Sequence, residues 1–293
     1  MTSNKKNKED VFKITIITVN YNVSKFVNRM IDSLTLINKH VREIIIIDNN
    51  SIDKEEIRQN DKTKIIYNKK NVGFSKAVNQ GILKAREDLI LLINPDCYLE
   101  NSSLLKSVKL IYMDKRIGAV GGKIKKHKSK NYQLTANNKA NFFTGLFEFT
   151  ILKKIFPNNM FSKSFWVENT KISQPQQVES LCGAYIIFRK KIDNKYNLFD
   201  ERYFLYLEDV DFGNKIKDIN YKVIFDPRSE ITHFGGKSSN SKYNIVLNEW
   251  YLSRRKYFTK HLSLVESKIL NTVFSIEETI LKVFHLIRKT PYV

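Results

Sequence analysis

Carboxylate and amide side chains stand directly after several apolar segments in the first half of the chain. Asp48 ends one such segment, Asp96 follows another, and Asn20 follows the first. If these segments are parallel strands of one sheet, their carboxyl ends lie at one edge, which is where such sheets bind ligands. Carboxylate oxygens are ligands for Mg²⁺ or Mn²⁺, and they also accept hydrogen bonds from the N3–H of a pyrimidine base. The pattern therefore predicts a binding edge that carries two carboxylates.

A second acidic group opens a predicted helix in the second half of the chain. It is Glu208-Asp209-Val210-Asp211, and the aromatic run Tyr203-Phe-Leu-Tyr206 precedes it. Acidic residues in a first helical turn complement the helix dipole and need no further function. The aromatic flank favours a chemical role, because it would desolvate a carboxylate and raise its pKa toward that of a useful general base.

A histidine, His233, follows a short apolar segment and precedes Gly235-Gly236-Lys237-Ser238. A lone histidine is usually structural. Here the glycines permit the close approach of a ligand, and the lysine and serine can bind phosphate oxygens. These residues favour a contact to a ligand that carries phosphate over a purely structural histidine.

The segments around these groups predict an α/β fold. Apolar segments alternate with segments whose apolar residues repeat at helical spacing. Strands that are apolar on both faces and alternate with helices are typical of a parallel sheet covered on both sides. We expect strands at 13–19, 43–48, 64–67, 88–93, 117–120, 222–225 and around Ile231, an ordered segment at 178–188, and helices at 23–34, 53–59, 74–86, 102–113, 208–219, 244–260 and 269–287.

Length and composition exclude several classes of protein. The chain has 293 residues, of which 42% are hydrophobic and 27% charged, which argues against a disordered chain or a coiled coil. No apolar run approaches the ~20 residues of a spanning helix, and the polar start leads us to expect no signal peptide. Cys97 and Cys182 are expected to be reduced thiols of a cytoplasmic protein. There is no GxxxxGK[ST] motif, which excludes a P-loop, and no GxGxxG motif follows the first strand.

The charge is strongly positive and unevenly distributed. The net charge is +20, from 50 basic and 30 acidic residues. Residues 121–163 carry nine lysines and one acid, and residues 251–293 carry eight basic and three acidic residues. Such an excess suits nucleic acid, an anionic membrane or a phosphorylated substrate, although a bias of the coding sequence would also produce it. We expect no nucleic acid partner, because no recognised binding motif accompanies the charge.

Several groups of residues, taken in order, resemble one family. In the first half they are Thr18-Val-Asn-Tyr-Asn22, Ile47-Asp-Asn-Asn-Ser51, Asn71-Val-Gly-Phe-Ser-Lys-Ala-Val-Asn-Gln-Gly81 and Leu92-Ile-Asn-Pro-Asp96. In the second half they are Gly183-Ala184 with Arg189, Phe199-Asp-Glu-Arg-Tyr-Phe-Leu-Tyr-Leu-Glu-Asp-Val-Asp211 and His233-Phe-Gly-Gly-Lys-Ser238. Together they resemble the family-two glycosyltransferases of the GT-A fold, and most closely the rhamnosyltransferase-like subgroup.

The resemblance implies a Rossmann-like, mostly parallel sheet covered by helices, with a C-terminal helical extension. We expect a GT-A domain at 13–260, made of a nucleotide-binding half (13–122), a basic and aromatic insertion (123–177) and an acceptor and catalytic half (178–260). A polar tail (1–12) would precede it, and an amphipathic helix (261–293) would follow it. The resemblance itself does not extend to the insertion or to the last helix.

The resemblance also implies a nucleoside diphosphate sugar as donor. Asp48 would contact the base, or else cap the following helix, and Gly73 would let the backbone approach an anion at a helix N-terminus. A surface position is an alternative for Asn79 and for Arg255, and core packing is the alternative for Tyr21. The expected donor-binding residues are Asn20, Tyr21, Asp48, Asn50, Asn71, Gly73, Phe74, Asn79, Asn94 and Arg255.

A divalent cation, Mg²⁺ or Mn²⁺, would neutralise the diphosphate. Asn94-Pro95-Asp96 takes the place of the family's Asp-x-Asp motif, with asparagine in place of the first acid. The resemblance therefore implies Asp96 and His233 as the metal-binding residues. An Asn-Pro-Asp turn without a ligand is the alternative.

The implied reaction is a single inverting displacement. Asp209 would take the proton of the acceptor hydroxyl, with Glu208, Asp211 and Gly183 in supporting or acceptor-facing positions. The donor would be a dTDP- or UDP-sugar carrying rhamnose or another hexose, and the acceptor a glycan or lipid-linked glycan in cell-surface polysaccharide biosynthesis. The alternatives are a sugar nucleotidyltransferase, whose Gly-rich N-terminal loop is missing, and a non-enzymatic basic protein that binds membrane or RNA.

The last segment carries an apolar stripe. Its members follow steps of four, three, four, four and three, as one face of a helix requires; they are Ile269, Val273, Ile276, Ile280, Phe284 and Ile287. Lys268, Lys282, Arg288 and Lys289 can reach an anionic lipid surface. The stripe predicts peripheral membrane contact, a homodimer through this helix, or packing on the chain's own catalytic domain.

Overall fold

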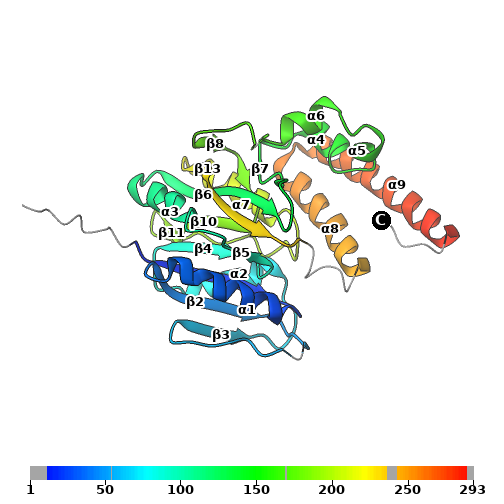
Figure 1. The fold of residues 1–293 in the computed structure, drawn as a ribbon. Coiled ribbons are helices and arrows are strands. Elements are labelled where there is room, and N and C mark those ends of the chain that lie inside the picture. Colours follow the sequence, from blue (N-terminus) through cyan, green and yellow to red (C-terminus); the bar gives the residue numbers. More distant parts are fainter. Residues whose placement is uncertain (1–11, 54, 169, 236–242, 289–293) are drawn as a thin grey trace, which may run out of the picture.

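A central mixed sheet organises the structure, a computed structural model that describes residues 12–53, 55–168, 170–235 and 243–288. Its strands are β1 (Ile14–Asn20), β2 (Val41–Asp48), β3 (Thr63–Tyr67), β4 (Leu89–Ile93), β5 (Cys97–Tyr98), β6 (Ile117–Lys126), β8 (Gln176–Val178), β10 (Tyr185–Arg189) and β13 (Lys222–His233). They run in the order β3-β2-β1-β4-β10-β6-β13-β5, with β8 beside β13 (Figure 1). The expected N-terminal tail lies outside the described residues, except for Phe12.

Most strands of this sheet run in the same direction. β1 pairs in parallel with β2 and β4, β2 does so with β3, and β6 with β13. β10 lies between the two groups and is antiparallel to both β4 and β6, while β5 and β8 are antiparallel to β13. The predicted mostly parallel α/β fold is therefore confirmed, with β10, β5 and β8 as the reversed strands.

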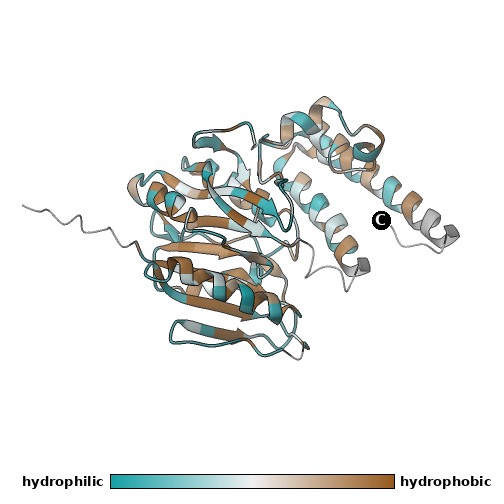
Figure 2. Ribbon diagram, viewed as in Figure 1, coloured by the Kyte–Doolittle hydropathy of each residue, from teal (hydrophilic) through white to brown (hydrophobic). Residues whose placement is uncertain are grey.

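Helices cover both faces of the sheet. They are α1 (Ser24–Ser33), followed by the 3-10 turn η1 (Leu34–Ile37), and then α2 (Phe74–Lys84), α3 (Leu104–Met113) and α7 (Glu208–Asp218). Val27 of α1 and Val108 of α3 pack in one apolar cluster. Ala77 of α2 and Phe212 of α7 belong to the cluster on the other face. Figure 2 shows the strands between these helices as hydrophobic along most of their length, which explains why they read as apolar runs.

A third apolar cluster joins the insertion to the C-terminal helices. The insertion contains α4 (Phe142–Phe147), α5 (Leu152–Ile155) and α6 (Met160–Phe165), and the chain ends in α8 (Tyr243–His261) and α9 (Leu264–Arg288). Phe149 and Phe165 of the insertion pack with Phe258 of α8 and Phe274 of α9. Two further pairs of short strands, β7 (Ala136–Asn137) with β9 (Ser180–Leu181) and β11 (Lys191–Ile192) with β12 (Lys195–Tyr196), complete the described elements.

The expected helix at 53–59 is wrong, because the described part of that segment is not helical. Its polar groups bind α1 instead of one another. Asp53 accepts a hydrogen bond from the amide of Ser24 at 2.7 Å, and Asn28 bonds both the carbonyl of Glu56 and the amide of Arg58. These bonds replace the ones that a helix would make.

One other expectation needs correction. The strands expected at 222–225 and around Ile231 form the single strand β13, whose register shifts between Asp226 and Glu230. This irregularity breaks the apolar pattern, so the sequence period alone does not reveal that one strand spans both segments. The expected order at 178–188 is confirmed, and the segment contains the end of β8, all of β9 and most of β10.

Candidate active site

Asp96 and His233 lie side by side at one end of the sheet. β5 and β13 are antiparallel, and their register pairs His233 with Cys97. The amide of Phe234 also donates to the carbonyl of Asp96 at 2.9 Å. This short pairing holds His233 Nε2 at 3.0 Å from Asp96 Oδ1, although 137 positions separate the two residues in sequence.

Gln133 is a neighbour of His233 that the sequence did not point to. Its Oε1 lies 3.0 Å from His233 Nδ1. Both ring nitrogens thus face oxygen atoms, and a neutral imidazole can donate to only one of them. If Nδ1–H donates to Gln133, the lone pair of Nε2 faces the carboxylate of Asp96. The two groups then repel each other unless they share a cation or a proton.

The residues present fit a Mg²⁺ or Mn²⁺ ion. Two ligands about 2.1 Å from an octahedral ion, at right angles to each other, would be about 3.0 Å apart, which is the separation of Asp96 Oδ1 from His233 Nε2. Cys97 completes a group of three donor atoms within 4.8 Å of one another. Burial keeps the pKa of the Cys97 thiol well above its ordinary value, and its Sγ donates to the carbonyl of Ala184 at 3.7 Å. The carboxylate and imidazole are therefore the better ligands of the three.

Asp48 lies in a buried polar network at the ends of β1 and β2. Its Oδ2 accepts from Asn20 Nδ2 at 2.7 Å and its Oδ1 accepts from the amide of Ser51 at 2.9 Å. Asn20 is fully buried and also bonds Ser24, Ser51 and the amide of Val23. The structure therefore places Asn20 behind Asp48, as a group that orients its carboxylate.

The residues beside Asp48 are more accessible. Asn50 is exposed and has a left-handed backbone, with φ of 66°. Tyr21 follows β1 directly and is partly buried. Asn94 is also partly buried, and its carbonyl accepts from the amide of Cys97 in the turn that carries Asp96.

The loop before α2 packs closely against another segment of the chain. Gly73 has φ of 86°, and a Cβ there would lie 2.8 Å from the carbonyl oxygen of Phe204. The next amide, of Phe74, donates to that same carbonyl at 2.7 Å. The side chain of Asn71 accepts from the amide of Gly73. The expected glycine is needed, but its neighbour is the segment that leads into α7.

Asn79 is likewise occupied by the chain itself. It is buried, and its amide bonds both the N–H and the C=O of Phe199 at 2.8 and 2.9 Å. Its Nδ2 also reaches Glu201 at 3.1 Å. These contacts correct the expected donor contact: Asn79 fastens the segment before α7 to the nucleotide-binding half.

Asp209 stands at the start of α7 against Gly183. The amide of Gly183 donates to Asp209 Oδ2 at 2.7 Å, and the amide of Val210 donates to Oδ1 at 2.8 Å. A Cβ at position 183 would lie 3.3 Å from Asp209 Cβ. The glycine thus lets a main-chain donor reach the carboxylate without a side chain beside it.

The next residue, Ala184, connects the position of Asp209 to the turn that carries Asp96. Its carbonyl accepts from the amide of Asn94 at 3.0 Å, in the turn that carries Asp96. The dipeptide Gly183-Ala184 therefore holds both Asp209 and the Asp96 turn in a fixed relation.

Glu208 and Asp209 divide the roles of acid and anion. Burial, followed by the charge of Asp209, raises the pKa of Glu208 to about 8. Among the described residues, Glu208 Oε2 has no hydrogen-bond partner. Burial also raises the pKa of Asp209, but the amides of Gly183 and Val210 oppose that rise. The two amides favour the charged form of Asp209 and burial favours the protonated form of Glu208, so Glu208 is the carboxyl of the pair that the structure favours as the acid.

The backbone just before α7 is strained. Tyr206 and Leu207 have φ of 74° and 64°, in the left-handed region that residues other than glycine rarely adopt. α8 supports this turn, because Ser253 Oγ donates to the carbonyl of Leu205 at 2.7 Å and Trp250 makes an edge contact with Tyr206. Strain of this kind is typical of functional sites. The sequence carried no signal for it.

Two expected site residues belong to the C-terminal helices instead. Asp211 is buried and bonded to Lys260 and His261 of α8, so it is structural rather than acceptor-facing. Arg255 bonds the carbonyl of Asn271 at 2.9 Å and pairs with Glu278 of α9 at 2.7 Å. The expected contact of Arg255 to the donor is therefore corrected. Lys237 and Ser238 lie outside the described residues.

Residues 15–196 match the family model described as Glycosyl transferase family 2. The chain is 23% identical over 240 residues to N-acetylglucosaminyl-diphospho-decaprenol L-rhamnosyltransferase of Mycobacterium tuberculosis, which covers 77% of both chains. It is 26% identical over 121 residues to poly-beta-1,6-N-acetyl-D-glucosamine synthase of Staphylococcus aureus, across 40% of this chain and 29% of that one.

Solved structures share the fold. GalNAc-T7 with UDP, GalNAc and Mn²⁺ superposes with a TM-score of 0.59 at 16% identity, across 91% of this chain. This chain spans only 55% of the GalNAc-T7 chain. The mannosyltransferase PcManGT from Pyrobaculum calidifontis, in complex with GDP-Man and Mn²⁺, superposes with a TM-score of 0.51 at 13% identity, across 90% of this chain and 80% of that one.

Proposed function

The chain belongs to glycosyl transferase family 2 and has the GT-A fold, and from this premise we propose that it moves rhamnose or another hexose from a dTDP- or UDP-sugar to an acceptor hydroxyl with inversion. The family assignment favours sugar transfer over the nucleotidyltransferase and non-enzymatic alternatives. The observation that carries the proposal is the attachment of Asp209 and the Asp96 turn to Gly183-Ala184.

Asp209 is the proposed general base. Its carboxylate keeps a negative charge through two main-chain N–H bonds, and each of its oxygens still has a lone pair that can accept the proton of the acceptor hydroxyl. Its raised pKa makes it a stronger base than an exposed aspartate. Burial raises the pKa of Glu208 to about 8, and we propose that Glu208 carries the proton of the pair and Asp209 the negative charge.

Asp96 and His233 are the proposed ligands of Mg²⁺ or Mn²⁺. When bound, such an ion would neutralise the charge of the departing nucleoside diphosphate. Gln133 orients His233 so that Nε2 faces Asp96. Only one carboxylate serves the ion, because Asn94 stands where the family's first acid would be, so diphosphate oxygens and water would complete the coordination.

Asp48 is the proposed contact to the nucleobase. Its two bonds to Asn20 and Ser51 fix the carboxylate and leave lone pairs for the N3–H of a pyrimidine. Thymine and uracil present the same N3–H and O4 edge, so this contact accepts either. Tyr21, Asn50, Asn71, Phe74 and Asn94 are the residues we propose around the rest of the donor.

The proposed setting is cell-surface polysaccharide biosynthesis on the cytoplasmic side, with a glycan or lipid-linked glycan as acceptor. The support is the name of the mycobacterial relative, which is a rhamnosyltransferase of a decaprenol-linked sugar, and that of the staphylococcal relative, which is a polysaccharide synthase. Both names describe those proteins, and we carry their acceptor class to this chain by analogy.

A thermal-shift panel tests the proposal. dTDP-rhamnose, UDP-hexoses and GDP-mannose are each offered with Mg²⁺, with Mn²⁺ or with EDTA. A bound donor raises apparent stability by mass action, so a dTDP- or UDP-sugar with metal should give the largest shift. Donors that give a shift are then tested for nucleoside diphosphate release. Pyrophosphate release from a nucleoside triphosphate would instead identify a nucleotidyltransferase, and stabilisation that follows salt alone would indicate a binding protein.

A further inference from the structure

Three members of the apolar stripe predicted on the last helix face outward. Ile269, Ile276 and Ile280 are 49%, 56% and 48% exposed, and Val273 is partly buried. α9 packs on the protein through a different face, which buries Leu270 and Phe274 completely. The helix therefore packs on its own domain, which is one of the predicted alternatives, while these three isoleucines stay uncovered.

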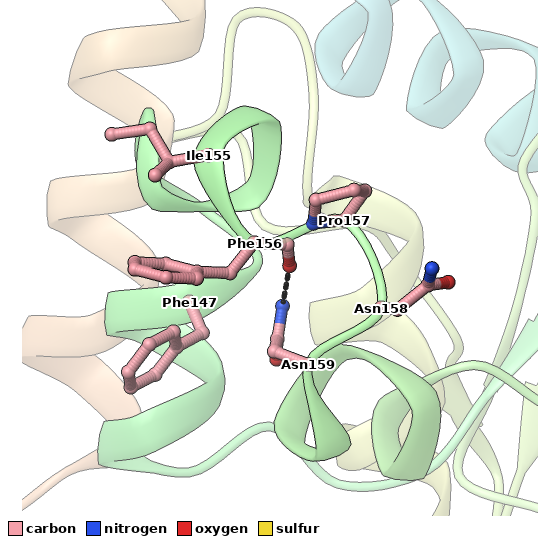
Figure 3. A pocket seen from close by; sticks show the side chains of 6 residues that line it. All are labelled: Phe147, Ile155, Phe156, Pro157, Asn158 and Asn159. Atoms are coloured by element: carbon pink, nitrogen blue, oxygen red, sulfur yellow. Dashed lines mark hydrogen bonds between the residues drawn. The ribbon is translucent and has the colours of Figure 1, made fainter.

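The insertion exposes apolar side chains of its own. All five residues from Lys154 to Asn158 are exposed, among them Ile155 at 58% and Phe156 at 53%, and Met160 is 72% exposed. Figure 3 shows the side chains of Phe147, Ile155 and Phe156 pointing the same way beside an open hollow of about 560 Å³. The side chain of Asn159 fixes the loop by donating to the carbonyl of Phe156 at 2.8 Å.

The stripe borders the insertion. Glu277 of α9 accepts a hydrogen bond from the amide of Ile151, just before α5, and Leu270 packs against Gly145 of α4. At about 100° per residue, the stripe lies next to Glu277 on the side away from Leu270 and α8. The exposed apolar residues of the two adjoining segments are together called the insertion–α9 face; they are Ile151, Ile155, Phe156, Met160, Ile269, Ile276 and Ile280.

Lysines accompany the insertion part of this face in the sequence. Between residues 139 and 163 the chain has four lysines, at 139, 153, 154 and 163, and one acid, Glu148. Glu148 is already bonded to Lys153 and to the indole of Trp166. The insertion therefore presents exposed aromatic and aliphatic groups with an excess of three positive charges, four minus one.

We propose that the insertion–α9 face docks on an anionic lipid bilayer. Apolar groups beside lysines suit the headgroup boundary of such a membrane. A second copy of the chain fits less well, because a two-fold contact through this face would set two surfaces with the same excess of positive charge against each other. Docking here means lying on the surface: among the helices of the described ranges, none has both the length and the apolarity to cross a membrane.

Vesicle flotation of the full chain tests the proposal. Vesicles of phosphatidylcholine with phosphatidylglycerol should bind it, and vesicles of phosphatidylcholine alone should bind it far less. The double variants Ile155→Ser/Phe156→Ser and Ile276→Ser/Ile280→Ser should each weaken binding to the anionic vesicles by about tenfold or more. Lys163→Glu should weaken it by about fivefold, and added salt should weaken it further.

The matched control is Leu36→Ser/Met113→Ser. These two residues are 49% and 70% exposed, on η1 and at the end of α3, which lies across the sheet from α9 (Figure 1). The control should bind vesicles as the wild type does, and thermal melts should show that all variants fold. Equal binding by face and control variants would overturn the proposal. So would a wild type that ignores anionic vesicles, or face variants that only convert a dimer to a monomer in light scattering.

Discussion

The main-chain amide of Gly183 donates a 2.7 Å hydrogen bond to the carboxylate of Asp209. The neighbouring residue, Ala184, accepts from the turn that carries Asp96. One dipeptide therefore sets the position of the proposed base relative to the proposed metal ligand. An inverting displacement needs a base on one side of the sugar carbon and a stabilised leaving group on the other, so rigid spacing between these groups is what the reaction requires.

We expect Asp96→Ala to weaken donor binding mainly in the presence of metal. The change removes the proposed carboxylate ligand, so calorimetric titration of the donor with Mg²⁺ should show a loss of about tenfold or more, whereas titration with EDTA should show little change. Asp88→Ala, which removes an aspartate with a 91% exposed side chain, is the control. Equal binding and equal transfer by the wild type with Mg²⁺ and with EDTA would exclude the metal.

Gln133→Leu should lower the affinity for Mn²⁺ by about 10- to 100-fold, as the loss of a partner behind a metal-binding histidine usually does. The leucine cannot accept the Nδ1–H of His233. Gln133→Glu keeps an acceptor oxygen and should recover most of the affinity. Titration of Mn²⁺ followed by electron paramagnetic resonance measures the free ion directly. If the leucine variant binds Mn²⁺ as tightly as the wild type, Gln133 does not position the histidine.

Glu208 should make stability fall as pH rises. Its pKa is about 8 in the folded protein against an ordinary 4.5, so the folded state holds the extra proton between these values. The stabilisation is complete below the lower value and is lost as pH rises through the higher one.

Glu208→Gln should flatten this dependence, because glutamine cannot ionise. Denaturant melts at about pH 5 and about pH 9 should show the difference in unfolding free energy shrinking by an amount on the order of 1–3 kcal/mol. Glu168→Gln, at an exposed position, should leave the difference unchanged. A variant at 208 that retains the full slope would place the titrating group elsewhere.

Arg254→Met should destabilise the C-terminal helices severely. The guanidinium is 1% exposed and pairs with Glu277 at 2.6 Å and Glu278 at 3.1 Å. Its loss leaves the carboxylate of Glu277, whose side chain is 9% exposed, without its cationic partner, whereas Glu278 keeps its ion pair with Arg255. Removing one partner of a buried ion pair costs about 3–5 kcal/mol. Arg255→Met, at a side chain that is 25% exposed, should cost about 1 kcal/mol. Equal losses in the two denaturant melts would contradict the assigned difference in burial.

The sheet and the polar edge that carries the candidate site could be predicted because each depends on local pattern. Apolar runs identified β1, β2 and β4, and the polar residues after them identified Asp48 and Asp96. The segment 53–59 could not be predicted, because its bonds go to Asn28 of α1 rather than to itself. Tertiary hydrogen bonds of this kind leave no period in the sequence.

Partners distant in sequence account for the other differences. Gln133 reaches His233 from the insertion, 100 positions earlier, and Asn79 reaches Phe199 across 120 positions. The predicted contact of Arg255 to the donor needed correction, because residue spacing does not show which neighbouring helix covers a charged side chain. The helical period identified the apolar stripe on α9. It could not show that the stripe is exposed, because that depends on the insertion, which packs on Leu270 and not on the stripe.

Asp209→Asn tests the central claim most directly. The asparagine keeps the size of the side chain but cannot take the acceptor's proton, so transfer should fall by about 10²- to 10⁴-fold while the donor dissociation constant stays within about twofold of the wild type. Nucleoside diphosphate release is measured with the donor identified by thermal shift, and donor affinity is measured by calorimetry on the same samples. Near-normal turnover would remove Asp209 from the mechanism, and loss of donor affinity would reassign it to the binding site.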